Sequence, residues 1–95
     1  MHFSDTAEIV VSKRHVWSDM GGEAAVLSLI NGVYYGLDSV GIRVWELIQQ
    51  PQTFARLREV LLGEYDVDAQ RLEADLRNFL TQLADQHLVE VGGLH

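Results

Sequence analysis

The sequence predicts an α+β domain in which a three-stranded antiparallel sheet is followed by three helices, in the order of a winged helix-turn-helix protein. Before residue 38, short apolar runs alternate with turn residues, as is typical of strands. After residue 38, apolar residues recur every three or four positions, as is typical of helices. A chain of 95 residues can supply one hydrophobic core, so we expect residues 1–95 to form a single domain.

The strands are expected in the N-terminal part of the chain. Residues 1–7 show no periodicity, and we expect them to be a loose end. Residues 8–11 have the pattern of a strand, and residues 15–17 either continue that strand or begin another short one. Residues 23–30 and 33–37 have the same pattern. Together these segments predict an antiparallel meander.

Asn31 and Gly32 separate the last two of these strands and predict a two-residue type I′ turn, because both residues tolerate the positive φ that this turn requires. Such a turn determines which residues face each other. The expected pairs are Ile30 with Val33, Leu29 with Tyr34, Ser28 with Tyr35, Leu27 with Gly36 and Val26 with Leu37. Both faces of the hairpin are then largely apolar, so we expect each face to be covered.

Capping residues predict where the first two helices begin and end. Asp38 or Ser39 is expected to cap the first helix, which ends before Pro51. Thr53 is expected to cap the second helix, and Gly63 stands where a helix C-terminus is expected.

The third helix is predicted to be the longest and to begin at Asp68. Its apolar residues repeat at intervals of three and four and therefore share one face. These residues are Leu72, Leu76, Phe79, Leu80 and Leu83. After this helix, residues 88–91 are expected to form a short terminal strand.

Charge and composition exclude several classes of function. Fourteen acidic and seven basic residues give a net charge of −7, which repels the phosphate backbone of nucleic acids. The chain has no cysteine, so thiolate catalysis, iron–sulfur clusters and cysteine-bound zinc are excluded within it. No segment approaches the roughly 18 apolar residues of a membrane span, and no secretion signal is visible. We therefore expect a cytoplasmic protein with no membrane partner.

No residue pattern indicates an enzyme, a metal site or a cofactor site. The four histidines are scattered and form no i, i+4 pair; they are His2, His15, His87 and His95. The serines lack the glycine-flanked context of a hydrolase nucleophile. Gly21 and Gly22 lead into a strand, whereas a phosphate-binding loop leads into a helix. We expect a protein without catalytic activity, metal or cofactor.

The strand at residues 33–37 is expected to lie at the edge of the sheet, where it could bind a peptide. An open edge beside an apolar groove can bind a peptide as an added strand, through main-chain hydrogen bonds and side-chain pockets. Alternatively, helices or a second copy of the chain cover both apolar faces. The sequence leaves both possibilities open.

Two segments carry a resemblance to a known family. The first is VYYGLDSVGIRVWELI, which joins the tyrosine-rich strand to the first helix, and the second is EYDVDAQRLEADLRNFLTQLADQHLVE. With Thr53 and its helix between them, they resemble the PqqD-like proteins, the recognition elements for ribosomally made and modified peptides. The similarity spans roughly residues 10–90. The chain looks most like the free-standing leader-binding subunit of lasso-peptide pathways.

The resemblance implies a fold of three strands and three helices, and a protein that binds the leader segment of a precursor peptide without catalysis. The leader would add to the third strand and pack against the third helix, and a tyrosine and a proline of the leader would enter an apolar pocket. The implied partners are a leader peptidase and an ATP-dependent macrocyclase. The implied peptide-binding residues are Val33, Tyr34, Tyr35, Gly36, Leu37, Arg71, Leu72, Asp75, Leu76 and Phe79, although Leu76 and Phe79 could also be ordinary core residues.

Three alternatives remain at this point. The protein could assist the precursor peptide of pyrroloquinoline quinone, or it could be a small enzyme with an unrecognised site. It could also be a winged-helix regulator that reads DNA with its third helix. The charges argue against DNA, because residues 68–85 contain four acidic residues and only Arg71 and Arg77 as basic ones.

Overall fold

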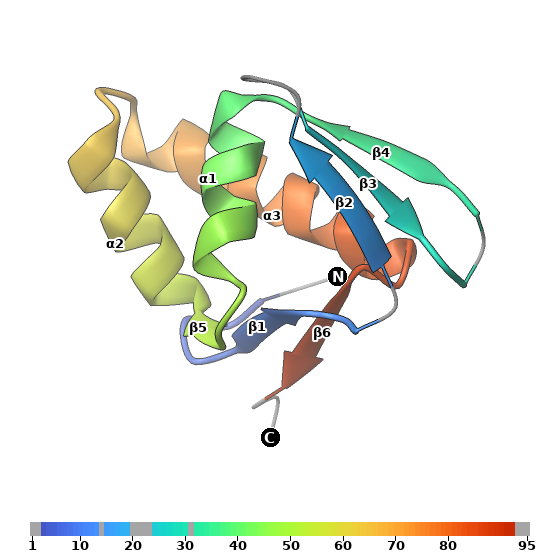
Figure 1. Cartoon of the computed structure of the whole chain (residues 1–95). Coiled ribbons are helices and arrows are strands. Elements are labelled where there is room, and N and C mark those ends of the chain that lie inside the picture. Colours follow the sequence, from blue (N-terminus) through green and yellow to red (C-terminus); the bar gives the residue numbers. More distant parts are fainter. Residues whose placement is uncertain (1–2, 14, 20–23, 31, 93–95) are drawn as a thin grey trace.

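The computed structural model describes residues 3–13, 15–19, 24–30 and 32–92. These residues form six strands and three helices, in the order expected of an α+β fold (Figure 1). The strands are β1 (Glu8–Val11), β2 (His15–Asp19), β3 (Ala24–Ser28), β4 (Tyr34–Leu37), β5 (Gln52–Thr53) and β6 (Val89–Gly92). The helices are α1 (Ser39–Leu47), α2 (Phe54–Glu64) and α3 (Ala69–Asp85).

The described strands form two antiparallel sheets, and the predicted meander is only one of them. This sheet has the order β2-β3-β4, and the other has the order β5-β1-β6. Residues 15–17 therefore belong to a separate strand and do not continue residues 8–11. The second sheet was not predicted, because β1 pairs with residues about 80 positions away, such as Val11 with Val89. A local sequence pattern carries no information about such a distant partner.

The register of the β3-β4 hairpin differs from the predicted one. Val26 faces Tyr35 instead of Leu37, and the ladder closes where the Ser28 N–H donates to the Val33 carbonyl at 3.0 Å. The loop therefore spans residues 29–32, of which Asn31 lies outside the described residues. The predicted two-residue type I′ turn is wrong for this reason.

Hydrogen bonding in the loop explains the shift. The Gly32 N–H donates to the Ser28 carbonyl at 2.9 Å, and Gly32 has a φ of 72°. The glycine thus provides the left-handed residue of a wider turn. The partner of each strand residue moves by two positions, which equals the strand period, so every side chain stays on its predicted face. Val26 and Leu37 lie on the core face, whereas Tyr34, on the other face, is 71% exposed.

All three predicted helix caps are confirmed. The side chain of Asp38 accepts from the Gly41 N–H at 2.7 Å, Thr53 caps α2 and Asp68 caps α3. The predicted end of α2 at Gly63 is wrong. The helix continues to Glu64, because its last turn is closed by the Tyr65 N–H donating to the Leu61 carbonyl.

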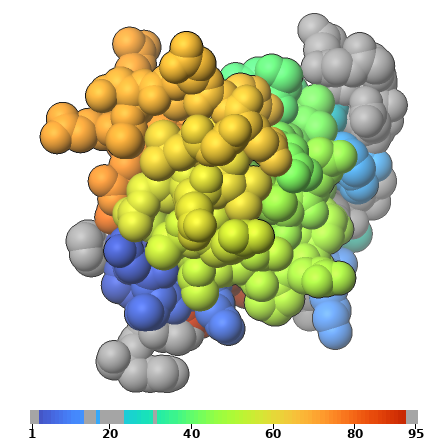
Figure 2. All heavy atoms as spheres, turned by 90° about the vertical axis from the view of Figure 1, so that its left-hand side faces the viewer, coloured from blue at the N-terminus to red at the C-terminus, as the bar shows by residue number. Residues whose placement is uncertain are grey.

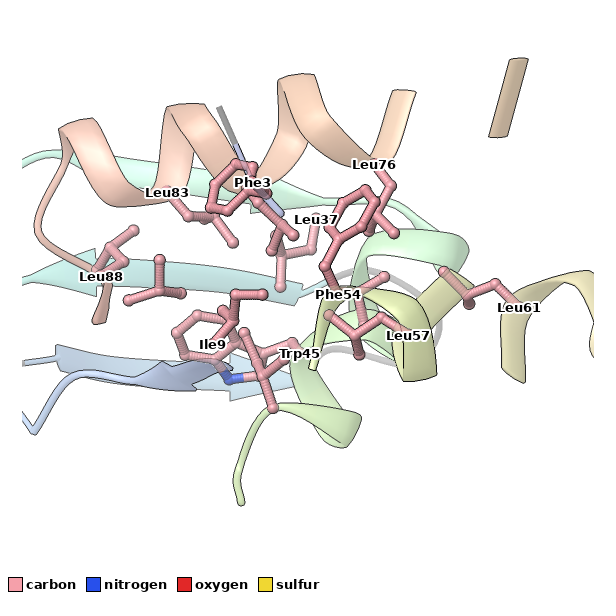
Figure 3. Packing of buried hydrophobic residues seen from close by; sticks show 14 of the residues in the cluster. Phe3, Ile9, Leu37, Trp45, Phe54, Leu57, Leu61, Leu76, Leu83 and Leu88 are labelled. Atoms are coloured by element: carbon pink, nitrogen blue, oxygen red, sulfur yellow. The ribbon is translucent and has the colours of Figure 1, made fainter. Parts of the chain in front are cut away.

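The hydrophobic core is formed by the strands together with all three helices. Figure 3 shows Leu76 and Leu83 of α3 pointing toward the layer that holds Ile9 and Trp45. Both of the latter side chains are fully buried. The four core leucines of α3 follow the predicted spacing, and they are Leu72, Leu76, Leu80 and Leu83. Burial of this apolar stripe is the main term that holds the longest helix in place.

The N-terminal residues 3–7 are packed against α2 and α3 (Figure 2), so the expected loose end is not found in this segment. Phe3 is fully buried and stacks on Phe54 with 5.9 Å between ring centroids. Arg77 donates to the Phe3 carbonyl at 2.5 Å. Arg58 pairs with Asp5 at 3.1 Å, and its hydrogen bond lowers the pKa of that carboxyl.

Within the described part of the chain, no helix combines the length and the apolar character needed to cross a membrane.

Candidate functional site

A cleft of about 340 Å³ lies among the three helices, beside the point where β4 leads into α1. Its walls are largely apolar. Residues from the start of α1, the end of α2, the α2–α3 connection and the first half of α3 line it. They are Asp38, Val40, Gly41, Val44, Leu61, Tyr65, Val67, Arg71, Leu72, Asp75, Leu76 and Phe79.

All five helix residues expected at the site line this cleft. Arg71 and Asp75 stand at its mouth, where their side chains are 83% and 69% exposed and their charged atoms lie 3.9 Å apart. Leu72 and Leu76 are buried and also belong to the core. Phe79 is half-buried. Leu76 therefore belongs to the core and lines the cleft as well, and its contact with a peptide stays a prediction.

None of the predicted strand residues lines the cleft, although Tyr35 and Leu37 lie next to residues that do. Within the described residues β4 pairs only with β3, so its other side is an open sheet edge. Hydrogen-bonding direction alternates along a strand. The backbone of Val33 is hydrogen-bonded to Ser28 of the facing strand segment. The backbone N–H and C=O groups of Tyr35 and Leu37 therefore also point toward β3. Those of Tyr34 and Gly36 point to the open side.

Tyr35 connects this edge strand to α3. Its ring lies 6.3 Å from the ring of Phe79, and its hydroxyl donates a hydrogen bond to Oε1 of Gln82. Burial raises the pKa of the Tyr35 hydroxyl. The contacts place the open edge directly beside the helix that lines the cleft.

An ion pair holds the other two helices of the cleft together. Arg43 of α1 donates to Glu64 at the end of α2 through two nitrogens, each at 2.8 Å. This hydrogen bonding lowers the pKa of Glu64. The ion pair thereby links the two helices that contribute Val44 and Leu61 to the cleft.

Sequence reasoning did not identify the part of the cleft formed by α1 and the α2–α3 connection. The sequence indicates only a capping role for Asp38, whereas Asp38, Val40 and Val44 all line the cleft. Gly41 and Val67 carry no local signal, because their role depends on the helices that pack around them. Among the described residues no group of three or more histidine, aspartate or glutamate side chains could hold a metal ion.

The chain is similar to known proteins in sequence and in structure. A family model described as coenzyme PQQ synthesis protein D (PqqD) matches residues 23–89. The chain is also similar to a solved structure described as TbiB1 in complex with the TbiA(beta) leader peptide. The two share 36% sequence identity and a TM-score of 0.77, over 85% of this chain and 94% of the other. Comparison with curated proteins gave no match.

Proposed function

Because the chain belongs to the PqqD family, we propose that it binds the leader segment of a ribosomally made precursor peptide and has no catalytic activity of its own. One observation carries this proposal: an open strand edge ends at an apolar cleft. An extended peptide can use both at once. The similarity to TbiB1, which was solved with a leader peptide, supports the same function.

In the proposed complex the leader adds as a further strand along β4. The outward N–H and C=O groups of Tyr34 and Gly36 would provide main-chain hydrogen bonds, which give affinity with little dependence on sequence. The strand would be held in place by the pairing of Val33, Tyr35 and Leu37 with the facing strand segment. Tyr35 would also maintain its contact with α3.

Selectivity in this proposal comes from the cleft. An apolar side chain of the leader would enter between Leu72, Leu76 and Phe79, while Arg71 and Asp75 would contact polar groups at the mouth. A tyrosine or a proline, the residues expected in a lasso leader, has the apolar character that this cleft fits.

The proposed pathway is lasso-peptide maturation in the cytoplasm. The bound leader would be presented to a leader peptidase, and the core peptide would then pass to an ATP-dependent macrocyclase. A second candidate is the pathway of pyrroloquinoline quinone, which the description of the matching family favours. A neighbouring gene for a peptidase would favour the first pathway, and one for a radical enzyme would favour the second.

The test is a titration of the protein with a fluorescently labelled leader peptide from the neighbouring precursor gene. We expect saturable binding at micromolar concentrations, measured by fluorescence anisotropy. A peptide with the same residues in scrambled order is the control. Absence of binding at high micromolar concentrations would contradict the proposed function.

A further inference from the structure

Gly41 occupies the corner where three elements meet at the entrance of the cleft. It lies in the first turn of α1, and its N–H donates to the capping carboxylate of Asp38. A Cβ atom at this position would lie 3.2 Å from Oδ1 of Asp38, 3.4 Å from Cζ of Phe79 and 3.5 Å from Cβ of Leu37. These neighbours belong to the α1 cap, to α3 and to the end of β4.

The backbone does not require glycine at this position. Gly41 is not among the residues with positive φ, and a glycine inside a helix is less stable than an alanine at the same position. What favours glycine is space, because the three neighbours leave little room for a side chain. Gly63 of α2 is different, since a Cβ there would meet no atom within 4 Å.

We propose that Gly41 determines how large an apolar peptide side chain the cleft accepts. The proposal rests on the proposed function, and it names a residue that controls selectivity within it. A side chain at position 41 would occupy the corner between α1 and Phe79. Since Phe79 lines the cleft and also contacts Tyr35, moving its ring would narrow the passage from the β4 edge into the cleft.

The size of the expected effect follows from the chemistry of apolar pockets. One methylene group more or less in such a pocket changes selectivity by about tenfold or more. Gly41→Val should therefore weaken binding of a leader with a large apolar anchor residue by at least about tenfold. Binding of the same leader with alanine at the anchor should change much less, and Gly41→Ala should give a smaller effect in the same direction.

The experiment measures the affinity of four proteins for two peptides. The proteins are the wild type, Gly41→Ala, Gly41→Val and the matched control Gly63→Val. The peptides are the labelled leader of the neighbouring precursor gene and its variant with alanine at the anchor position, which an alanine scan of the leader identifies. Circular dichroism and thermal unfolding verify that each variant is folded.

We expect the Gly41 variants to lose affinity only for the leader with the large anchor residue. Gly63→Val should bind both peptides like the wild type. Equal weakening of both peptides, or none, in folded Gly41 variants would overturn the proposal. If Gly41→Val does not fold, Gly41→Ala decides by the same criterion.

A second arm separates this proposal from the proposed function. p-Cresol, which resembles a tyrosine side chain, is titrated while the methyl resonances of Val40 and Val44 are followed by NMR. We expect shifts in the wild type and in Gly63→Val that are reduced in the Gly41 variants. If no leader binds but these shifts occur as described, the proposed function fails, whereas the control that Gly41 exerts on the entry of an apolar group into the cleft stands. Equal shifts in all four proteins, or none in any, would overturn the role of Gly41.

Discussion

Neighbouring residues of β4 have different roles because the strand directs its backbone groups alternately to two sides. The backbone N–H and C=O groups of Tyr35 point toward β3 and belong to the ladder inside the sheet, whereas those of Gly36 point to the open edge. The predicted register of the β3-β4 hairpin placed both residues on the correct faces of the sheet. It assigned the wrong cross-strand partner to each residue. A test of strand addition must therefore change Gly36, because proline at Tyr35 would break the internal ladder.

Gly36→Pro should weaken leader binding by about tenfold, because it removes one main-chain donor worth about 1 kcal/mol or somewhat more. Proline is tolerated where the lost N–H faces away from the sheet. The matched control is Gly36→Ala, which keeps the N–H and adds a Cβ that meets no atom within 4 Å. Fluorescence anisotropy measures both affinities. Equal binding by the two variants would show that the leader does not pair with this edge.

At the scale of single residues, the five α3 residues that the family resemblance implies as peptide-binding all line the cleft. Arg71 and Asp75 are four residues apart and therefore lie on one side of the helix. Their contact with a peptide stays a prediction. Gly41 and Val67 could not be predicted, because their place in the cleft depends on how α1, α2 and α3 pack.

At the scale of elements, the N-terminal segment shows most clearly how packing can override a weak local pattern. Residues 3–7 have no periodicity, yet Phe3 is buried against Phe54. Arg77 lies over the ring of Phe54 at 4.4 Å and also binds the carbonyl of Phe3. Burial of Phe3, together with contacts from Arg77 and Arg58, thus holds a segment that forms no helix or strand.

Phe3→Ala should therefore lower the free energy of unfolding by about 3 kcal/mol or more, the range for removal of a buried phenylalanine ring. Urea denaturation followed by circular dichroism measures this change. The control is Thr6→Ala in the same segment, where the side chain is exposed and a change within about 0.5 kcal/mol is expected. Unchanged stability of Phe3→Ala would mean that the segment does not contribute to the core.

At the scale of the whole molecule, charge distribution separates peptide binding from DNA binding. The chain carries a net charge of −7. Of the two basic residues of α3, Arg77 is engaged by the Phe3 carbonyl and by Glu73, and Arg71 stands beside Asp75. The helix that would read a DNA groove therefore offers no cluster of positive charge.

We expect no retardation of a 20-base-pair duplex by the protein at about 100 µM, even at about 50 mM salt, where phosphate contacts are strongest. An electrophoretic mobility assay measures this, with a winged-helix DNA-binding protein as the positive control. Tight binding that weakens steeply with added salt would contradict the expectation and restore the DNA-binding alternative.

The sequence by itself determined the three helices, their caps, most of the strands and the α+β class, because period and capping are local properties of the chain. It also carried the family resemblance. Only the tertiary structure decided the second sheet, the hairpin register, the anchoring of Phe3 and the corner at Gly41. Each of these depends on segments that meet only after folding, as when β1 pairs with β6. The open β4 edge becomes a candidate binding site because folding places it beside the cleft.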